Sequence, residues 1–397
     1  MLAAGIITEY DPFHAGHAWQ IEQAKALGAQ AVAVCMSTDV TQRGGLALLP
    51  PWVRAKAALQ AGADLVLGLP APCALQSAEG FAAAGVAALT ALPGLSWLVF
   101  GAESPEVQAL KQTAALLDEP EFQQELSRQL ATGISFAAAR AKAAARLLPL
   151  AGQVLASPNN NLGVEYCKAI RRSKSHLEPV PLPRKGAAHG QLTPGQEGFA
   201  SATFLRQAWA REGAQGLQGY VPDQALELYR QAQQQGLDIS GFRFELAVLS
   251  RLRAASVEQL AQVRDTAEGL EHRLAQAVAR ATSLEELYSL LKTKRYAHAR
   301  LRRYVLCAAL GYTGQTSGMP SYLHILGATP QGLELLRGAA LPADTSLARL
   351  ARLGQAQPGQ VQAHAAAADL AALCRSQPGP MGQCYTQPPC FVGKRKQ

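Results

Sequence analysis

The stretch that decides the fold is LAAGIITEYDPFHAGH, residues 2–17. Residues 2–8 form a short apolar run that is typical of a buried strand. The polar residues that follow end in H-x-G-H, where His14 and His17 stand three positions apart. Residues 15–27 have helical character and stop before Gly28. The stretch therefore predicts a strand, a polar loop and a helix that begins beside two imidazoles.

The same alternation continues along the first hundred residues. Further short apolar runs lie at residues 31–36, 65–69 and 96–100, with helical patterns at residues 52–60 and 76–91. Strands separated by such helices predict an α/β fold with a Rossmann-like parallel sheet. Because ligands bind beyond the carboxyl ends of parallel strands, we expect the segments after the strands to form the site. These segments are residues 9–17, 37–44, 70–78 and 101–104.

The remainder of the chain has a different pattern. Residues 104–150 indicate helices, and residues 151–210 mix loops with short helices. From about residue 223 to about residue 375 the pattern is almost only helical. The last twenty residues are rich in Pro, Gly and Gln and predict a loose tail with one short strand near residues 390–392. We therefore divide the chain into an α/β domain of residues 1–222 and a mostly helical domain of residues 223–397.

The composition is that of a globular protein with a basic balance. Hydrophobic residues make up 48% of the 397 residues and charged residues 17%, which excludes an intrinsically disordered chain. Lys and Arg number 37 against 29 Asp and Glu, a formal charge of +8 at pH 7. This balance favours an anionic partner, nucleic acid above all, although a mildly basic enzyme would carry the same charge.

The sequence indicates a cytoplasmic protein. Its first ten residues lack the basic region of a secretory signal, and no run of 18 apolar residues suggests a membrane span, so we expect no membrane partner. The seven cysteines are scattered and contain no C-x-x-C pair. This pattern fits a reducing compartment and argues against a zinc site, so we expect no metal held by protein ligands alone.

The H-x-G-H motif carries a specific chemistry. In nucleotidyl transferases and class I aminoacyl-tRNA synthetases, this motif opens the helix after the first strand. Attack on the α-phosphate of ATP builds negative charge, which requires positioned donors. We expect His14 and His17, the candidate catalytic residues, to lie together on the first turn of a helix whose N-terminus favours anions. Gly16 is expected to let the nucleotide approach the backbone closely.

A second phosphate signal is Ser201-Ala202-Thr203-Phe204-Leu205-Arg206, at the start of a predicted helix. It resembles the S-x-T-x-x-R pattern that closes the site in many nucleotidyltransferases. Ser201 or Thr203 could cap the helix while Arg206 reaches a phosphate. The alternative is an ordinary helix cap without a ligand.

Two basic groups suit an RNA backbone. Residues 292–303 hold six basic side chains and no acidic one, so ion pairs within the segment do not explain them. We expect a basic helix that contacts tRNA through Lys292, Lys294, Arg295, Arg300, Arg302 and Arg303. The alternative is a solvated helix face. Lys168, Arg171, Arg172 and Lys174 form the second group, which either lines the path from ATP to the tRNA or is merely exposed.

Residues 5–17, GIITEYDPFHAGH, are very similar to the opening of the bacterial tRNA(Met) cytidine acetate ligase family, which is close to G-I-I-x-E-Y-N-P-F-H-N-G-H. Further blocks agree with the family in order. They are residues 36–37 with 42–44, 62–66, 76–82, 100–103, 157–166, 184–189 and 201–206. The resemblance continues more thinly through residues 268–271 and 292–303 to residues 326–327, and so covers most of the chain.

The resemblance implies an ATP-dependent ligase with a nucleotidyltransferase-like sheet in residues 1–222 and a tRNA-binding helical part in residues 223–397. Such a ligase activates acetate as acetyl-adenylate, with ATP and Mg²⁺, and acetylates the wobble cytidine of elongator tRNA(Met) to N4-acetylcytidine. The resemblance leaves protein partners open. Carried over by position, the ATP site comprises Ile7, Thr8, Glu9, Tyr10, Asp11, Pro12, Phe13, His14, Ala15, Gly16, His17, Ala18, Trp19, Gln20, Gly101, Asn159 or Asn160, and Arg184, with Ser201, Thr203 and Arg206 closing it.

Three positions depart from the family pattern. Asp11 and Ala15 stand where the family usually has Asn, and Ala188 replaces an aromatic residue. We expect the Asp11 carboxylate to repel the phosphates mildly, with a contribution to magnesium binding as the alternative. Two other functions remain open, a small-molecule nucleotidylyltransferase with the same motif and a non-catalytic tRNA-binding homologue.

Overall fold

The computed structural model describes residues 2–184, 199–267, 269–293, 296–353 and 357–393. Its strands are β1 (Ala3–Thr8), β2 (Ala31–Ser37), β3 (Leu65–Leu69), β4 (Trp97–Ala102), β5 (Glu178–Pro183), β6 (Leu323–Ala328), β7 (Ala343–Asp344) and β8 (Cys390–Phe391). The helices of the first half are α1 (Ala15–Ala26), α2 (Pro51–Gln60), α3 (Ala71–Ala74), α4 (Ala78–Thr90), α5 (Val107–Leu116), α6 (Pro120–Ala131), α7 (Phe136–Leu147), α8 (Pro149–Leu155) and α9 (Pro158–Ser173).

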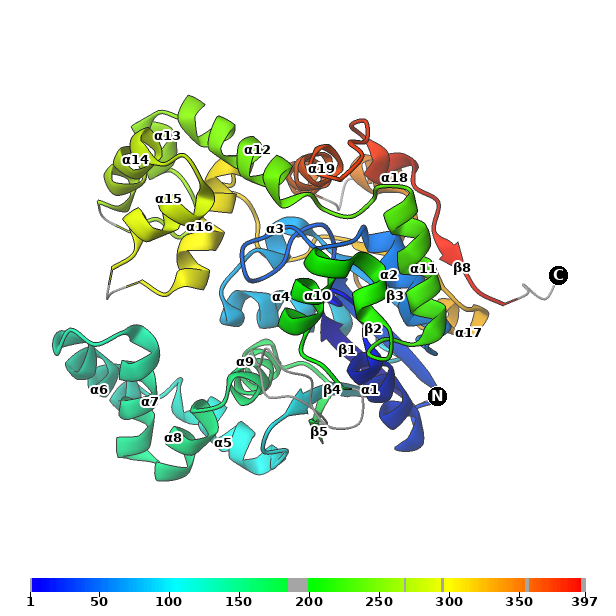
Figure 1. Ribbon diagram of the computed structural model, residues 1–397. Helices are drawn as coiled ribbons and strands as arrows, with labels where there is room; N and C mark the ends of the chain where they lie inside the picture. Colours follow the sequence, from blue (N-terminus) through cyan, green and yellow to red (C-terminus); the bar gives the residue numbers. More distant parts are fainter. Residues whose placement is uncertain (1, 185–198, 268, 294–295, 354–356, 394–397) are drawn as a thin grey trace.

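The second half is mainly helical. Its helices are α10 (Ala202–Glu212), α11 (Asp223–Gln234), α12 (Gly241–Ala254), α13 (Val257–Ala261), α14 (Leu270–Arg280), α15 (Leu284–Leu291), α16 (His298–Leu310), α17 (Pro330–Glu334), α18 (Leu347–Arg352), α19 (Pro358–Leu373) and α20 (Gln383–Thr386). Figure 1 shows the sheet at the centre and two groups of helices, α5–α8 and α12–α16, that extend from it on the same side. None of the helices in the described ranges combines the length and the apolar character needed to cross a lipid bilayer.

The sheet has the strand order β5-β4-β1-β2-β3-β6-β7, and β8 pairs with β6. Strands β1 to β5 run parallel, which confirms the predicted α/β fold. Successive residues of β1 face opposite sides, as the two-residue period requires. Ala3 and Ile7 pack in one hydrophobic cluster with Phe81 of α4, whereas Ile6 packs in the other with Ile21 of α1. Both faces are therefore buried, which explains why the strands are apolar throughout.

Strand β5 was not predicted, because its sequence, EPVPLP, contains three prolines. The backbone N–H groups of Glu178 and Arg184 donate to Ser96 and Ala102, on the β4 side. Alternate residues of a strand direct their backbone N–H groups to opposite sides, and these two residues have even numbers. The odd-numbered Pro179, Pro181 and Pro183 therefore direct their nitrogens, which carry no hydrogen, to the open edge of the sheet. Proline is tolerated on an edge strand for this reason. The strand ends at Arg184 and thus delivers this side chain to the carboxyl end of the sheet.

The almost purely helical pattern predicted for residues 223–375 is wrong at residues 323–328. These residues form β6, which pairs antiparallel with β3 inside the sheet. The run LHILGA is fully buried, and a short buried apolar run is compatible with either a strand or a helix. The short strand expected near residues 390–392 is confirmed by β8. The division of the chain at residue 222 stays a prediction, but the sheet itself takes strands from both sides of that boundary.

One buried guanidinium holds the carboxyl ends of β1 and β2 in place. Arg54 of α2 has no exposed surface. Its nitrogens donate to the carbonyl oxygens of Glu9 (2.6 Å) and Ser37 (3.0 Å), of Thr38, and of Leu49 (2.8 Å). A planar group with five donors can satisfy several carbonyls at once. The segments that follow β1 and β2 are therefore tied to α2 and to each other.

Replacing Arg54 by lysine should lower the free energy of unfolding by about 3 kcal/mol. One ammonium group cannot reach four carbonyls, so buried acceptors lose their partners. Urea unfolding measures the loss. The matched control is Arg337→Lys, whose side chain is 80% exposed and whose replacement should change the free energy by less than about 0.5 kcal/mol. Equal effects of the two substitutions would contradict the role given to Arg54.

Candidate active site

A cavity of about 420 Å³ lies at the carboxyl ends of β1 and β4. Most of the predicted ATP-site residues line it. They are Ile7, Thr8, Glu9, Tyr10, Asp11, His14, Gly16, His17, Trp19, Gln20, Gly101, Asn159, Arg184, Ser201, Thr203 and Arg206. Five others do not line it, namely Pro12, Phe13, Ala15, Ala18 and Asn160. Phe13, for example, is completely buried and accepts a hydrogen bond at its carbonyl from the Tyr229 hydroxyl (2.9 Å).

The two imidazoles form the first turn of α1. His14 is the N-cap of α1, and its Nδ1 accepts a hydrogen bond from the Gly16 N–H (3.1 Å). His17 Nδ1 in turn accepts from the His14 N–H (3.2 Å). Their reciprocal bonds match a capping box. The ring centroids are 3.7 Å apart and the rings are stacked.

Both imidazoles are neutral donors. Burial, together with Arg184 and Arg206, lowers the pKa of His14 to about 3. Burial and the neighbouring His14 and Arg184 hold the pKa of His17 well below its usual value. Because each Nδ1 accepts a backbone N–H, the single proton of each neutral ring must sit on Nε2. Each ring therefore has its Nε2–H available for a phosphate oxygen.

The absence of a side chain at Gly16 leaves room for the His14 imidazole. A Cβ at this position would lie 2.9 Å from Cε1 and 3.1 Å from Nδ1 of His14. Such contacts would push the ring away from its cap position. The expectation that Gly16 lets the nucleotide approach the backbone is therefore supplemented by a second reason, the room that the His14 ring needs.

Three guanidinium groups line the same cavity, from Arg43, Arg184 and Arg206. The predicted S-x-T-x-x-R helix is α10, and the Ser201 side chain caps it by accepting from the Phe204 N–H (3.1 Å). Thr203 Oγ1 accepts from Arg206 (3.4 Å) and from Arg43 (3.2 Å). Planar guanidinium groups beside neutral imidazole donors suit a phosphate chain.

The Asp11 carboxylate is engaged within the protein. Its Oδ1 accepts from the Leu48 N–H (2.7 Å), and its Oδ2 lies 3.4 Å from Arg206. Arg206 also donates to the Asp11 carbonyl (2.7 Å). The side chain is only 7% exposed. Asp11 thus positions Arg206, a role that neither of the two expected ones included.

The three adjacent asparagines have separate places. Asn159 and Asn161 line the cavity. Asn160 is buried and its Oδ1 accepts from the backbone N–H groups of Glu103 (3.0 Å) and Ser104 (3.2 Å). The geometry therefore favours Asn159 over Asn160 as the candidate ATP-site residue. Asn160 instead fixes the segment after β4.

Some lining residues were not predicted. Gln42, Arg43 and Ala78 fall in the segments expected after the strands, so the position of those segments was the signal that could have found them. Phe81 and Tyr166 come from the interiors of α4 and α9. They could not be predicted from the expectation that the segments after the strands form the site. The other unpredicted residues that line the cavity are Phe100, Pro158, Asn161, Leu162, Leu182, Phe199, Ala200 and Ala202.

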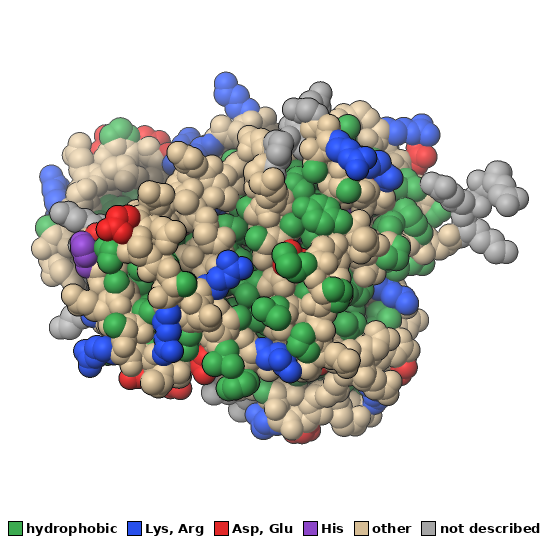
Figure 2. All heavy atoms as spheres, turned by 90° about the horizontal axis from the view of Figure 1, so that it is seen from above, with side chains coloured by type: hydrophobic (Ala, Val, Ile, Leu, Met, Phe, Trp, Pro, Cys, Tyr) green, Lys and Arg blue, Asp and Glu red, His purple; other side chains and the backbone are tan. Residues whose placement is uncertain are grey.

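The basic segment of residues 292–303 is not one helix. α16 begins only at His298, and Lys294 and Arg295 lie outside the described residues. Arg300 lies over the Tyr296 ring (4.9 Å), and the exposed Arg302 lies over Tyr288 (5.6 Å). On the face shown in Figure 2, Lys and Arg side chains are spread among neutral ones rather than gathered in one patch. The exposed Arg302 and the half-buried Arg300 thus each have an aromatic neighbour, which suits RNA.

Three members of this segment make internal bonds, and one of them is Arg300, whose Nη2 donates to the Asp265 carbonyl (3.2 Å). Lys292 Nζ donates to the Tyr296 carbonyl (2.5 Å). The half-buried Arg303 donates to the carbonyl of Gln42 (3.1 Å). Arg303 therefore connects α16 to the segment that lines the cavity, and its expected contact with RNA has a structural alternative.

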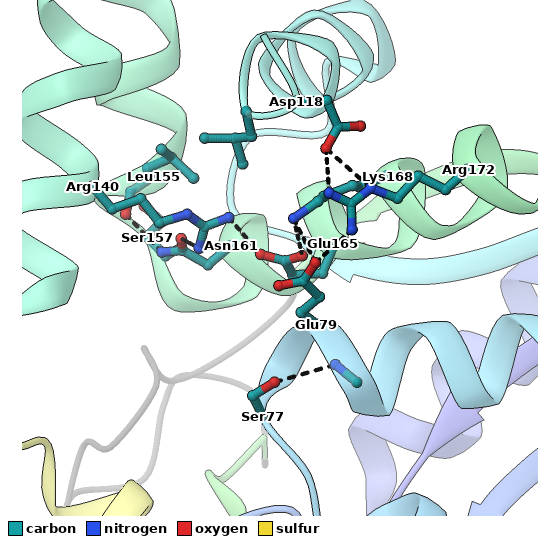
Figure 3. A network of polar contacts seen from close by, with 12 residues as sticks. Ser77, Glu79, Asp118, Arg140, Leu155, Ser157, Asn161, Glu165, Lys168 and Arg172 are labelled. Carbon is teal, nitrogen blue, oxygen red and sulfur yellow. Dashed lines mark hydrogen bonds and ion pairs between the residues drawn. The ribbon is translucent and has the colours of Figure 1, made fainter. Parts of the chain in front are cut away.

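Three members of the second basic group, Arg171, Arg172 and Lys174, are exposed, and two of these three make ion pairs. Lys168 is buried, and its Nζ lies 2.8 Å from Glu79 and 3.8 Å from Glu165. Arg171 and Arg172 pair with Asp118 (2.7 and 2.6 Å). Figure 3 shows Lys168 and Arg172 of α9 reaching towards Glu79 and Asp118. These ion pairs join α9 to α4 and to the segment after α5, whereas Lys174 is the exposed C-cap of α9.

Among the described residues, no group of three or more His, Cys, Asp or Glu side chains is placed to hold a metal ion. All seven cysteines are free thiols, and five of them are buried. Ala188, one of the three departures from the family pattern, lies outside the described residues.

The chain is similar to known proteins over nearly its whole length. The family model described as HIGH Nucleotidyl Transferase matches residues 1–378. The tRNA(Met) cytidine acetate ligase of Caldanaerobacter subterraneus subsp. tengcongensis is 33% identical over 346 residues, 85% of this chain and 86% of that protein. The ligase of the same name from Bacillus licheniformis is 34% identical over 346 residues, 84% and 83% of the two chains.

Solved structures agree with the sequence relatives. Thermotoga maritima TmcAL bound with alpha-thio ATP superposes with a TM-score of 0.90, and its apo form with 0.91. Both are 26% identical and cover 99% of this chain and 100% of the other. The chain therefore belongs to the tRNA(Met) cytidine acetate ligase family of HIGH nucleotidyl transferases.

Proposed function

We propose that this chain is an ATP-dependent ligase that activates acetate as acetyl-adenylate and acetylates the wobble cytidine of elongator tRNA(Met) to N4-acetylcytidine. The names of its relatives support the ligase reaction and the tRNA. The observation that carries the proposal is the cavity in which two neutral imidazoles and three guanidinium groups converge. A relative with the same fold binds an ATP analogue.

The geometry supports the first half-reaction directly. An acetate oxygen attacks the α-phosphate, and negative charge grows on the phosphoryl oxygens and on the departing pyrophosphate. His14 and His17 offer fixed Nε2–H donors that need no reorganisation, and Arg184 and Arg206 supply positive charge. Preorganised donors of this kind stabilise the transition state more than the ground state.

We further propose that Mg²⁺ arrives on the ATP phosphates. Glu9 and Asp11 are the carboxylates of the described cavity lining, and Asp11 is bonded to Leu48 and Arg206. Magnesium commonly binds through substrate phosphates and few protein ligands. The protein would work in the cytoplasm, with residues 1–222 holding most of the ATP site and residues 223–397 contributing the tRNA contacts.

The two alternative functions have weaker support. A small-molecule nucleotidylyltransferase would not need the helical part, yet the similarity to the ligases spans about 85% of the chain. A non-catalytic tRNA-binding homologue would not need the stacked imidazoles and their free Nε2–H donors.

The proposed function is tested by incubating the protein with ATP, labelled acetate and total tRNA. Nucleoside mass spectrometry should find labelled N4-acetylcytidine in elongator tRNA(Met). Acetate-dependent exchange of pyrophosphate into ATP should occur without tRNA. Labelled nucleotide without any labelled tRNA, or transfer of the nucleotide to another small molecule, would favour a small-molecule nucleotidylyltransferase.

The imidazoles can be separated from their capping role. An asparagine in place of His14 and a glutamine in place of His17 keep the acceptors that the Gly16 and His14 N–H groups require but remove the imidazole donors. His14→Asn and His17→Gln should each lower the rate of pyrophosphate exchange by about 10²- to 10³-fold, the usual effect of losing one transition-state donor.

Thermal unfolding is the control for these two variants. The midpoint should stay close to that of the wild type for His14→Asn and for His17→Gln, whereas His14→Ala should lower it through loss of the cap. A near-normal exchange rate in either capped variant would show that its imidazole is not needed for the chemistry.

The basic surface of α16 gives a second test. Arg300→Ala with Arg302→Ala should weaken tRNA binding several-fold and reduce its salt dependence, because fewer counterions are released. Exchange without tRNA should remain. Arg303 is left intact since it bonds to Gln42. Arg337→Ala, three residues after the end of α17, is the matched control, and Figure 1 shows α17 on the opposite side of the sheet from α16. Unchanged tRNA affinity in the double variant would identify this surface as merely solvated.

A further inference from the structure

The second half-reaction needs a proton acceptor. The N4 amine of cytidine attacks the acyl carbon of acetyl-adenylate, the bond from that carbon to the phosphate oxygen breaks, and AMP leaves as an anion. One proton must leave N4 as the new C–N bond forms. A positioned base that accepts it typically contributes 10²- to 10⁴-fold.

Most groups of the cavity cannot accept this proton. The Nδ1 atoms of His14 and His17 are occupied by backbone N–H groups, and the Nε2 atoms carry the ring protons. Both Asp11 oxygens face partners in Leu48 and Arg206. Tyr166 is a phenol whose pKa burial raises further, so it keeps its proton.

Glu9 is different. It follows β1 directly and lines the cavity. Its Oε1 accepts from the Gln42 N–H (2.5 Å). Its Oε2 makes no hydrogen bond to any other part of the chain that the structure describes. Glu9 thus combines a carboxylate held at one oxygen with a second oxygen that remains available to a substrate.

The segment that holds Glu9 is itself held by α16. Arg303 donates to the Gln42 carbonyl (3.1 Å). Gly44 has a φ of +81°, and a Cβ there would overlap the backbone nitrogen of Arg303, so only glycine allows this close approach. One residue, Gln42, therefore links the carboxylate of Glu9 to α16, the helix that carries Arg300 and Arg302.

We propose that Glu9 is the general base of the acetyl transfer, oriented by the Gln42 N–H. The proposal rests on the proposed function. The Glu9 carboxylate takes the proton from cytidine N4 as the amine attacks, AMP departs with both electrons of the broken C–O bond, and the proton then passes to solvent. Atoms and charge balance without any further reactant.

The surroundings strengthen the base. Burial and the nearby Asp11 raise the pKa of Glu9, while the Gln42 N–H, Arg43 and Arg206 lower it, and the balance lies above the usual value. Tyr166 of α9 lines the same cavity, and the Glu9 charge helps to raise its pKa. Because a base must be deprotonated to act, the rate of transfer should rise with pH through this raised pKa.

The experiment compares the two half-reactions in Glu9→Gln. Gln keeps an acceptor for the Gln42 N–H but cannot take up a proton. We expect acetyl transfer in a single turnover, from acetyl-adenylate already formed on the enzyme, to fall about 10²-fold more than pyrophosphate exchange does. The rise of the transfer rate with pH should also disappear. Asp11→Asn is the matched control, and it should change both half-reactions by a similar factor.

A second variant tests the positioning. Gly44→Ala should move the Gln42 segment away from α16 and reduce transfer more than exchange, while the rise of the rate with pH remains because the carboxylate is still present. Equal losses in both half-reactions of Glu9→Gln, normal transfer in that variant, or a raised magnesium requirement for exchange would each overturn the assignment. If the wild type forms no acetyl-adenylate, the proposed function fails as well, and the two failures are thereby distinguished.

Discussion

The geometry of the site depends on the buried guanidinium of Arg54. Four carbonyl oxygens from the ends of β1 and β2 and from the segment before α2 converge on it. One of them belongs to Glu9, so the same residue that faces the cavity with its carboxylate is fixed through its backbone. Unpaired carbonyls in this position would be costly to bury. The Arg54 guanidinium therefore orders the backbone, and other arginines provide the positive charge of the cavity.

Much of the α/β core could be predicted from the sequence, since β1 to β4 are short apolar runs bounded by turns. The remainder could not, for definite physical reasons. β5 has the composition of a loop, and only its place at the sheet edge makes its prolines acceptable. β6 is buried on both faces, so its pattern carries no period that distinguishes a strand from a helix. In both cases tertiary position decided the structure.

The candidate site was also predictable only in part. The H-x-G-H motif and the S-x-T-x-x-R motif predicted residues that do line one cavity, because both motifs begin helices whose N-termini face it. Hydrogen bonds that depend on distant segments were not predictable. The cap formed by His14, the link between Asp11 and Arg206, and the ion pairs of Lys168 all depend on partners that a linear pattern does not bring together.

Strand β6 also bears on how the chain can be made and divided. Until residues 323–328 have been synthesised, β3 has no neighbour on its outer side, and a row of backbone N–H and C=O groups is left open. An open edge of this kind invites pairing with another chain. A fragment that ends at residue 222 would contain both imidazoles and all three cavity arginines, yet it would expose this edge. The candidate ATP site of this ligase family member is thus encoded early in the chain, whereas the sheet that carries it is completed by a segment encoded late.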